Sequence, residues 1–206
     1  MHIANVARLA PWLLIAALGI PADAQRAIFR TYTVEHGLGQ SQLEAVVQDT
    51  RGYLWVGTHH GVSRFDGLTF ENFTKRDGLL ENTISAAYVD ERGAVWFGHP
   101  SGGVTYYDGD RFVNLPSSPG RDAPVRAFVE DRQGNLWIGT DGGGLARLRH
   151  GTLTTFDTRN GLTNDFVWAL REDREGGLWV GTNGGGLNRL KNGAVRTLTT
   201  REGLPG

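Results

Sequence analysis

The stretch EDREGGLWVGTNGGGLNRL, residues 172–190, indicates the architecture because close copies of it recur along the chain. Its centre is the pattern D-x-x-G-x-[LV]-W-x-G, in which a turn-forming aspartate and glycine precede an apolar segment. The tryptophans of its four copies are 41, 41 and 42 residues apart: Trp55, Trp96, Trp137 and Trp179. The aspartates are Asp49, Asp90, Asp131 and Asp173. A fixed period of about 40 residues indicates a repeat architecture.

Each copy contains four short β signals separated by turn residues, for example 84–89, 95–98, 104–107 and 112–115 in the second copy. Four strands in about 40 residues are typical of one blade of a β-propeller. We therefore predict an all-β propeller with four four-stranded blades, at about residues 42–74, 83–115, 125–157 and 166–199. The repeat tryptophans are expected to pack between blades. Each repeat aspartate is expected to bind turn amides beside a glycine of positive φ.

The repeat region begins and ends at different points of the repeat unit. Residues 29–33 align with 70–74, the fourth strand of the first blade, so they predict an outer strand with no blade of its own. Residues 203–206 stand where a further first strand is expected. We interpret the chain as the N-terminal part of a longer protein whose incomplete ring is closed by further blades. A closed four-bladed ring is the alternative.

The first 24 residues have the pattern of a signal peptide. A weakly positive start precedes an apolar run from Leu9 to Ile20, and Ala22-Asp23-Ala24 is an A-x-A cleavage site. Twelve apolar residues are too few to span a bilayer, which needs about 20. We expect an exported, periplasmic protein.

Composition excludes several classes of function. The 206 residues include 21 basic and 22 acidic side chains, which argues against a nucleic-acid partner. The absence of cysteine excludes disulfides, a cysteine nucleophile and thiolate metal sites. The repeat aspartates offer too few carboxylates for calcium, and the glycine runs lack the phosphate-loop pattern. We predict neither cofactor nor metal.

The repeats resemble those of the two-component regulator propeller family. The resemblance rests on residues 48–67, 130–148 and 172–190 and on the connecting NGLTNDFVWAL of residues 160–170. It implies an exported sensor propeller without catalytic residues. It also implies that further blades, a membrane helix anchored in the inner membrane, and a histidine kinase or diguanylate cyclase output domain follow in the same protein.

Ligand-binding residues are expected where the loops depart from the repeat. In ordinary blade order, the loops after W-x-G and after Gly-Leu share one face, and non-repeating residues there are candidates for function. The candidates are His59, His60, His99, Asp141, Asn183, Asn82 and Asn164. We expect the three histidines to be solvent-exposed loop residues, with a metal site or an acid–base pair as alternatives. Trp168, outside the repeat phase, is expected in the core, with a position facing the central channel as the alternative.

Three hypotheses for function follow. The first is the ligand-sensing extracytoplasmic propeller of a membrane-anchored two-component or cyclic-di-GMP receptor, lacking its output domain here. The second is a secreted propeller module that binds a glycan or a protein. The third is a propeller lyase or hydrolase that uses the loop histidines. The ligand itself, whether small molecule, glycan or protein, is not identified by the sequence.

Overall fold

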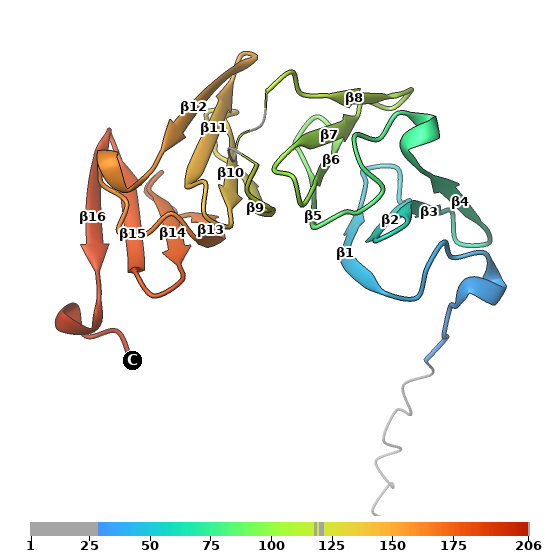
Figure 1. Cartoon of the computed structure of the whole chain (residues 1–206), viewed down its shortest axis with the longest axis horizontal. Coiled ribbons are helices and arrows are strands. Elements are labelled where there is room, and N and C mark those ends of the chain that lie inside the picture. Colours follow the sequence, from blue (N-terminus) through green and yellow to red (C-terminus); the bar gives the residue numbers. More distant parts are fainter. Residues whose placement is uncertain (1–28, 118, 120–121, 206) are drawn as a thin grey trace, which may run out of the picture. The chain divides into compact units, whose positions relative to one another are not determined.

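The computed structural model describes residues 29–117, 119 and 122–205, so the predicted signal peptide at residues 1–24 lies outside the described residues. Contacts divide the chain into two units, and the second, which begins at Tyr32, contains all the described strands. In the second unit the described strands form four antiparallel sheets of four strands, each in chain order (Figure 1). The predicted all-β fold of four four-stranded blades is confirmed.

The sixteen described strands are distributed evenly over the blades. Blade 1 contains β1 (Leu43–Gln48), β2 (Leu54–Thr58), β3 (Gly61–Phe65) and β4 (Phe70–Phe73). Blade 2 contains β5 (Ala86–Val89), β6 (Val95–Gly98), β7 (Val104–Tyr107) and β8 (Phe112–Asn114). Blade 3 contains β9 (Val125–Glu130), β10 (Leu136–Thr140), β11 (Leu145–Arg149) and β12 (Thr152–Phe156). Blade 4 contains β13 (Val167–Glu172), β14 (Leu178–Thr182), β15 (Gly186–Lys191) and β16 (Ala194–Leu198).

The D-x-x-G segment forms the turn between the first and second strands of every blade. In blade 3, Oδ1 of Asp131 accepts hydrogen bonds from the backbone N–H groups of Gln133 (3.0 Å) and Asn135 (2.9 Å). Gly134 closes the turn at φ 73°, a left-handed conformation that glycine adopts without steric cost. The predicted role of the aspartate in the turn is confirmed.

The same aspartate also binds the repeat tryptophan, a contact that the sequence did not predict. The indole Nε1 of Trp137 donates to Oδ2 of Asp131 at 2.7 Å. The other three blades repeat this bond at 2.9, 2.8 and 2.9 Å. Because an indole N–H buried without a partner is costly, the turn carboxylate allows the tryptophan to enter the core.

Three blades are followed by a short 3-10 turn that ends in the Gly-Leu marker. After β4 it spans η2 (Lys75–Asp77), after β12 η3 (Thr158–Asn160) and after β16 η4 (Thr200–Glu202). The C-cap glycine that ends η2, Gly78, has φ 112°, and the following Leu79 is buried in the core shared with blade 2. The leucine of the marker therefore packs in the apolar core between its own blade and the next.

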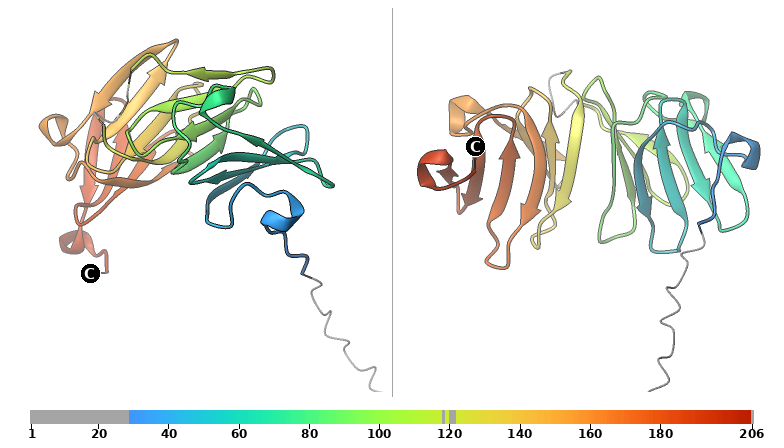
Figure 2. Two further views of the ribbon diagram at one scale, coloured as in Figure 1. Left: turned by 45° about the vertical axis from the view of Figure 1, so that its right-hand side comes forward. Right: turned by 90° about the horizontal axis from the view of Figure 1, so that it is seen from below.

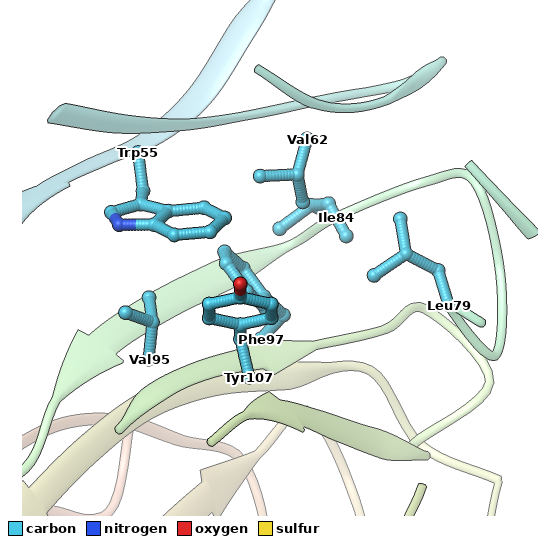
Figure 3. Packing of buried hydrophobic residues seen from close by; sticks show 7 residues of the cluster. All are labelled: Trp55, Val62, Leu79, Ile84, Val95, Phe97 and Tyr107. Carbon is cyan, nitrogen blue, oxygen red and sulfur yellow. The ribbon is translucent and has the colours of Figure 1, made fainter. Parts of the chain in front are cut away.

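The core lies between blades, and each junction joins a tryptophan to the next sheet. At the first junction, Trp55 of β2 packs against Tyr107 and Phe97 of blade 2, with ring centroids 5.0 and 5.9 Å apart (Figure 3). Trp55 is fully buried, and Ile84 packs in the same cluster. Trp96 and Trp137 are buried in the equivalent clusters of the second and third junctions. The interblade position predicted for these three tryptophans is confirmed.

The first strands of successive blades lie side by side. Contacts join β1 to β5, β5 to β9 and β9 to β13, whereas the outermost strands diverge (Figures 1 and 2). Within the described residues the four blades do not close into a ring.

The outer strand predicted at residues 29–33 would complete a blade other than the four described here, so it stays a prediction. At the end of this segment, Thr33 caps the 3-10 turn η1 (Val34–His36).

Candidate functional site

Residues of different chemistry occupy the start of each first strand. In β1, β9 and β13 one residue bulges out of the pairing with the second strand: Glu44, Arg126 and Trp168 respectively. Ser85 is the equivalent residue before β5. Because a β-bulge redirects a side chain and is frequent beside functional sites, this position can present a new group without altering the blade. The four blades present a carboxylate, a hydroxyl, a guanidinium and an indole there.

Two of these residues meet at Asp141, which follows β10. Nη2 and Nε of Arg126 lie 2.5 and 3.0 Å from Oδ2 of Asp141. Nε1 of Trp168 donates to Oδ1 at 3.1 Å, so residues of blades 3 and 4 are joined. The indole hydrogen bond, followed by the hydrogen bond and charge of Arg126, lowers the pKa of Asp141 against the opposing effect of burial. We call Arg126, Asp141 and Trp168 the Asp141 cluster.

The indole of the Asp141 cluster is open to solvent. Trp168 is 52% exposed, so the prediction that it belongs to the core is wrong. Its neighbour Val167 takes the buried place in the junction, and the bulge directs the next side chain outward. An exposed aromatic ring beside a fixed carboxylate and guanidinium offers both apolar contact and hydrogen bonding to a ligand.

Blade 1 has a related but separate pair. Nε2 of His59 lies 2.9 Å from Oε1 of Glu44, and both side chains are exposed. The backbone N–H of His59 donates to Oε1 of Gln40 at 3.0 Å. His60 is exposed, and its backbone N–H donates to Oγ1 of Thr58.

His99 differs from the other two histidines because it is fully buried. Nδ1 lies 3.0 Å from the carbonyl oxygen of Thr83, and Nε2 lies 2.8 Å from Oγ1 of Thr105. The expectation that His99 is a solvent-exposed loop residue is therefore wrong. It replaces the threonine that follows W-x-G in the other three blades, and its longer side chain reaches across to the loop before β5.

The burial of His99 predicts a pH-dependent stability. Burial, the largest effect, lowers its pKa, so below about pH 6.5 the imidazole of the unfolded chain takes up a proton that the folded chain excludes. Stability therefore falls as the pH drops below that value toward the lower folded pKa. His99→Thr should reduce this slope in urea unfolding followed by circular dichroism, whereas His60→Thr should retain it. An equal slope in both variants contradicts the assignment.

The two predicted loop sets do meet on one face. The hydroxyl of Thr83 donates to the carbonyl of His59 at 3.3 Å, and the backbone N–H of Gly142 donates to the carbonyl of Asp165 at 3.1 Å. These loops alternate between neighbouring blades, as ordinary blade order predicts.

The three predicted asparagines lie in these loops, and two of them support the backbone. Oδ1 of Asn82 accepts from the N–H of Lys75 at 2.9 Å, and Oδ1 of Asn164 accepts from the N–H of Phe166 at 2.8 Å. The backbone N–H of Asn183 donates to the carbonyl of Phe166. Among the described residues no group of three or more His, Cys, Asp or Glu side chains could hold a metal ion.

Two grooves lie at the other end of the second strands, beside the D-x-x-G turns. One, of about 520 Å³, separates blades 2 and 3 and is lined by Trp96, Tyr106 and Leu148 among others. The other, of about 500 Å³, separates blades 3 and 4 beside Trp137 and Phe156. Neither is lined by a predicted ligand-binding residue.

Glu44 and Arg126 were not among the site residues predicted from the sequence, and Trp168 was predicted to lie in the core. A signal was present, because the residue after the first apolar position of each blade is Glu44, Ser85, Arg126 or Trp168, whereas the next one is always alanine. A position that varies from blade to blade, between an apolar residue and an alanine that both recur, therefore indicates the side chain that the bulge directs outward.

Four-stranded blades that pack face to face define this chain as a protein of the β-propeller class. Within that class, the family model for the two component regulator propeller matches residues 119–142 and 161–184. The resemblance inferred from the sequence is thereby confirmed for these two segments, which include the D-x-x-G-x-[LV]-W-x-G copies of blades 3 and 4.

The chain is also similar to parts of larger proteins. It is 41% identical over 61 residues to histidine kinase P4 of Formosa agariphila, which covers 29% of this chain and 4% of the kinase. It matches the extracellular domain of the hybrid two component system BT3049 from B. thetaiotaomicron at 28% identity and a TM-score of 0.71, over 82% of this chain and 24% of that one. The chain thus spans about a quarter of that domain.

Enzymes share the fold as well. Virginiamycin B lyase from Staphylococcus aureus matches at 13% identity and a TM-score of 0.59, over 76% of this chain and 55% of that one. This likeness concerns the fold alone. No helix of the described residues is long and apolar enough to cross a membrane.

Proposed function

We propose that these blades belong to the ligand-sensing extracytoplasmic propeller of a membrane-anchored two-component or cyclic-di-GMP receptor. The likeness to the extracellular domain of a hybrid two component system and to a segment of a histidine kinase supports the proposal. The signal-peptide pattern of residues 1–24 supports export to the periplasm. The partners are then the remaining blades and the output domain of the same protein.

The observation that carries the proposal is the Asp141 cluster. Trp168 comes from blade 4, while Arg126 and Asp141 come from blade 3. A ligand that stacks on the indole and bonds the Arg126–Asp141 pair therefore contacts two blades at once. Binding that favours one arrangement of neighbouring blades shifts the population toward it, which is how a sensor transmits occupancy.

The geometry gives the enzyme hypothesis less support. His99 has both ring nitrogens engaged inside the protein, so it does not form an exposed acid–base pair with His59. We propose a non-catalytic role for this segment. A secreted binding module would use the same face. The gene sequence beyond codon 206 distinguishes the two hypotheses: a membrane helix encoded there favours the receptor, and further repeats without a membrane helix favour the secreted module.

Trp168→Ala should reduce ligand-induced stabilisation by about half or more. The test is a thermal-shift screen of the chain against panels of oligosaccharides, amino acids and short peptides. A ligand at 100 times its Kd stabilises the folded state by about 2.7 kcal/mol. Loss of the indole should weaken binding at least about tenfold.

The matched control is Arg171→Ala, an exposed arginine on the same strand, which should bind like the unmodified chain. A ligand that stabilises the unmodified chain and Trp168→Ala equally shows that the site is elsewhere.

A further inference from the structure

Three of the four blades place an arginine of the third strand against the repeat tryptophan. The guanidinium carbons of Arg64, Arg147 and Arg189 lie 5.4, 5.6 and 5.5 Å from the tryptophan ring centroids of blades 1, 3 and 4. An aromatic ring attracts a cation placed over its face, so the contact is favourable in all three blades. The three arginines differ in what balances their charge.

The arginines of blades 1 and 4 are paired with acidic side chains of their own blade. Arg64 forms an ion pair with Glu71 of β4. Nη2 of Arg189 lies 2.6 Å from Oδ2 of Asp173 and 2.8 Å from Oε2 of Glu175, both in the D-x-x-G turn. A guanidinium that is partly withdrawn from water thus has a carboxylate beside it in these two blades.

Blade 3 has a neutral residue at both of these acidic positions. The residue that pairs with Arg147 on the fourth strand is Thr154. Two positions after the turn aspartate stands Gln133, where blade 4 has Glu175. Nε of Arg147 is buried and makes no hydrogen bond with a described residue. Of the three arginines, Arg147 alone forms no ion pair within the part of the chain that the structure describes.

One side chain keeps this arginine away from the turn aspartate of its own blade. Nδ2 of Asn135 donates to Oδ1 and Oδ2 of Asp131 at 2.9 and 2.7 Å. Blade 4 has Gly177 at the same repeat position, and a Cβ added there would lie 2.6 Å from Nε of Arg189. Asn135 therefore fills the space through which the arginine of blade 4 reaches its aspartate.

Arg147 lines the groove of about 500 Å³ between blades 3 and 4. This volume is in the range of sites that bind small molecules. The rings of Trp137 and Phe156 flank the guanidinium, with centroids 5.6 and 5.7 Å from its carbon atom, so its position is fixed before any ligand arrives. Leu178 and Leu190 add apolar surface to the same groove.

The other charged side chains that line this groove have partners. Oε2 of Glu172 lies 3.6 Å from Nε of Arg132, and Nζ of Lys191 lies 3.2 Å from Oε2 of Glu175. The turn aspartate accepts the hydrogen bonds from the indole and the amide described above. Arg147 is therefore the charge of the groove that its surroundings leave unbalanced.

We propose that this groove binds a small organic acid, whose carboxylate takes the place on Arg147 that an acidic side chain takes in blades 1 and 4. A planar guanidinium matches a carboxylate with two parallel hydrogen bonds, and the apolar lining receives the body of the acid. The groove is separate from the Asp141 cluster, so the proposal does not depend on the function proposed above.

Proton–nitrogen NMR of the arginine side chains tests this site on the full chain, with phenylacetate as the probe. The Nε–H signal of Arg147, assigned from its loss in Arg147→Gln, should shift in a saturable way. Phenylacetamide, which lacks the charge, should bind at least about tenfold more weakly. Gln133→Glu supplies the carboxylate that blade 4 has in Glu175, so it should also weaken phenylacetate binding at least about tenfold.

Gln133→Lys is the matched control, because it changes the same exposed side chain without supplying a carboxylate and should retain binding. Arg149→Gln removes an exposed arginine of β11 that does not line the groove, and it should bind like the unmodified chain. The proposal is overturned if phenylacetate causes no saturable shift of the Arg147 signal. Equal binding of phenylacetate and phenylacetamide, or equal binding by Gln133→Glu and Gln133→Lys, also overturns it.

Discussion

Gly98→Ala is expected to destabilise the protein by about 2 kcal/mol, because it places a methyl group inside a blade junction. The added Cβ would lie 2.5 Å from both Cβ and Cγ1 of Val125 and 3.3 Å from the ring of Phe128. Val125 is fully buried and cannot rotate away without moving β9. The cost should appear in urea unfolding as a lower midpoint with an unchanged m-value.

Gly181→Ala is the matched control, since it changes the same repeat position in blade 4, where an added Cβ would meet only Ala169 of the same blade, at 3.4 Å. Replacing glycine by alanine restricts the unfolded chain, so without overlap the change should be neutral or stabilise by about 0.5 kcal/mol. Equal destabilisation by both substitutions contradicts the junction argument, because the loss then comes from the strand itself.

A double-mutant cycle sharpens this prediction. Val125→Ala alone should be destabilising because it leaves a cavity, but beside Gly98→Ala it makes room for the new methyl group. The pair should therefore cost less than the two single losses added together. Strict additivity shows that the two residues do not share the junction.

The blades could be predicted from the sequence because each is specified by local signals. The D-x-x-G turn and the alternating apolar strands lie within one repeat, so they define four strands without knowledge of the neighbouring blades. The spacing from Trp55 to Trp96 then gives the length of the repeat. Residues 29–33 show the limit of this reasoning, because they match the pattern of a fourth strand but local signals do not identify the blade that it completes.

The candidate site was less predictable because it depends on contacts between blades. His99 and Thr140 occupy the same repeat position, yet only the distances to Thr83 and Thr105 show that the histidine is buried. Tryptophan is a residue type that is expected in a core, and only the bulge in β13 directs the side chain of Trp168 toward solvent. In the sequence the bulge is marked only by the varying residue between the first apolar position of each blade and the alanine that follows it.

Asp131→Ala is expected to destabilise the protein by about 4 kcal/mol, because two or more donors lose their acceptor, at about 1–3 kcal/mol each where buried. The carboxylate accepts from the indole of Trp137, the backbone of Gln133 and both the backbone and side chain of Asn135. Trp137 and Asn135 are buried, so water does not replace the lost acceptor. Asp66→Ala is the control: Asp66 also accepts from two turn amides, at 2.7 Å each, but is exposed and should cost under about 1 kcal/mol.

The charge of Asp131 adds a pH dependence that separates it from a neutral acceptor. Burial, the largest effect, raises the pKa of Asp131, but the hydrogen bonds from Trp137 and Asn135 outweigh it and hold the pKa below its ordinary value. A depressed folded pKa stabilises the protein above the ordinary pKa near 4, and this contribution is lost as the pH falls through the lower folded value. The test variant is Asp131→Asn, which keeps one acceptor oxygen. Unfolding measured at a series of pH values should show this variant to be less stable than the unmodified chain at neutral pH, and the difference in stability should become smaller in acid. A difference that stays constant into acid shows that hydrogen-bond geometry alone, and not the carboxylate charge, supports the turn.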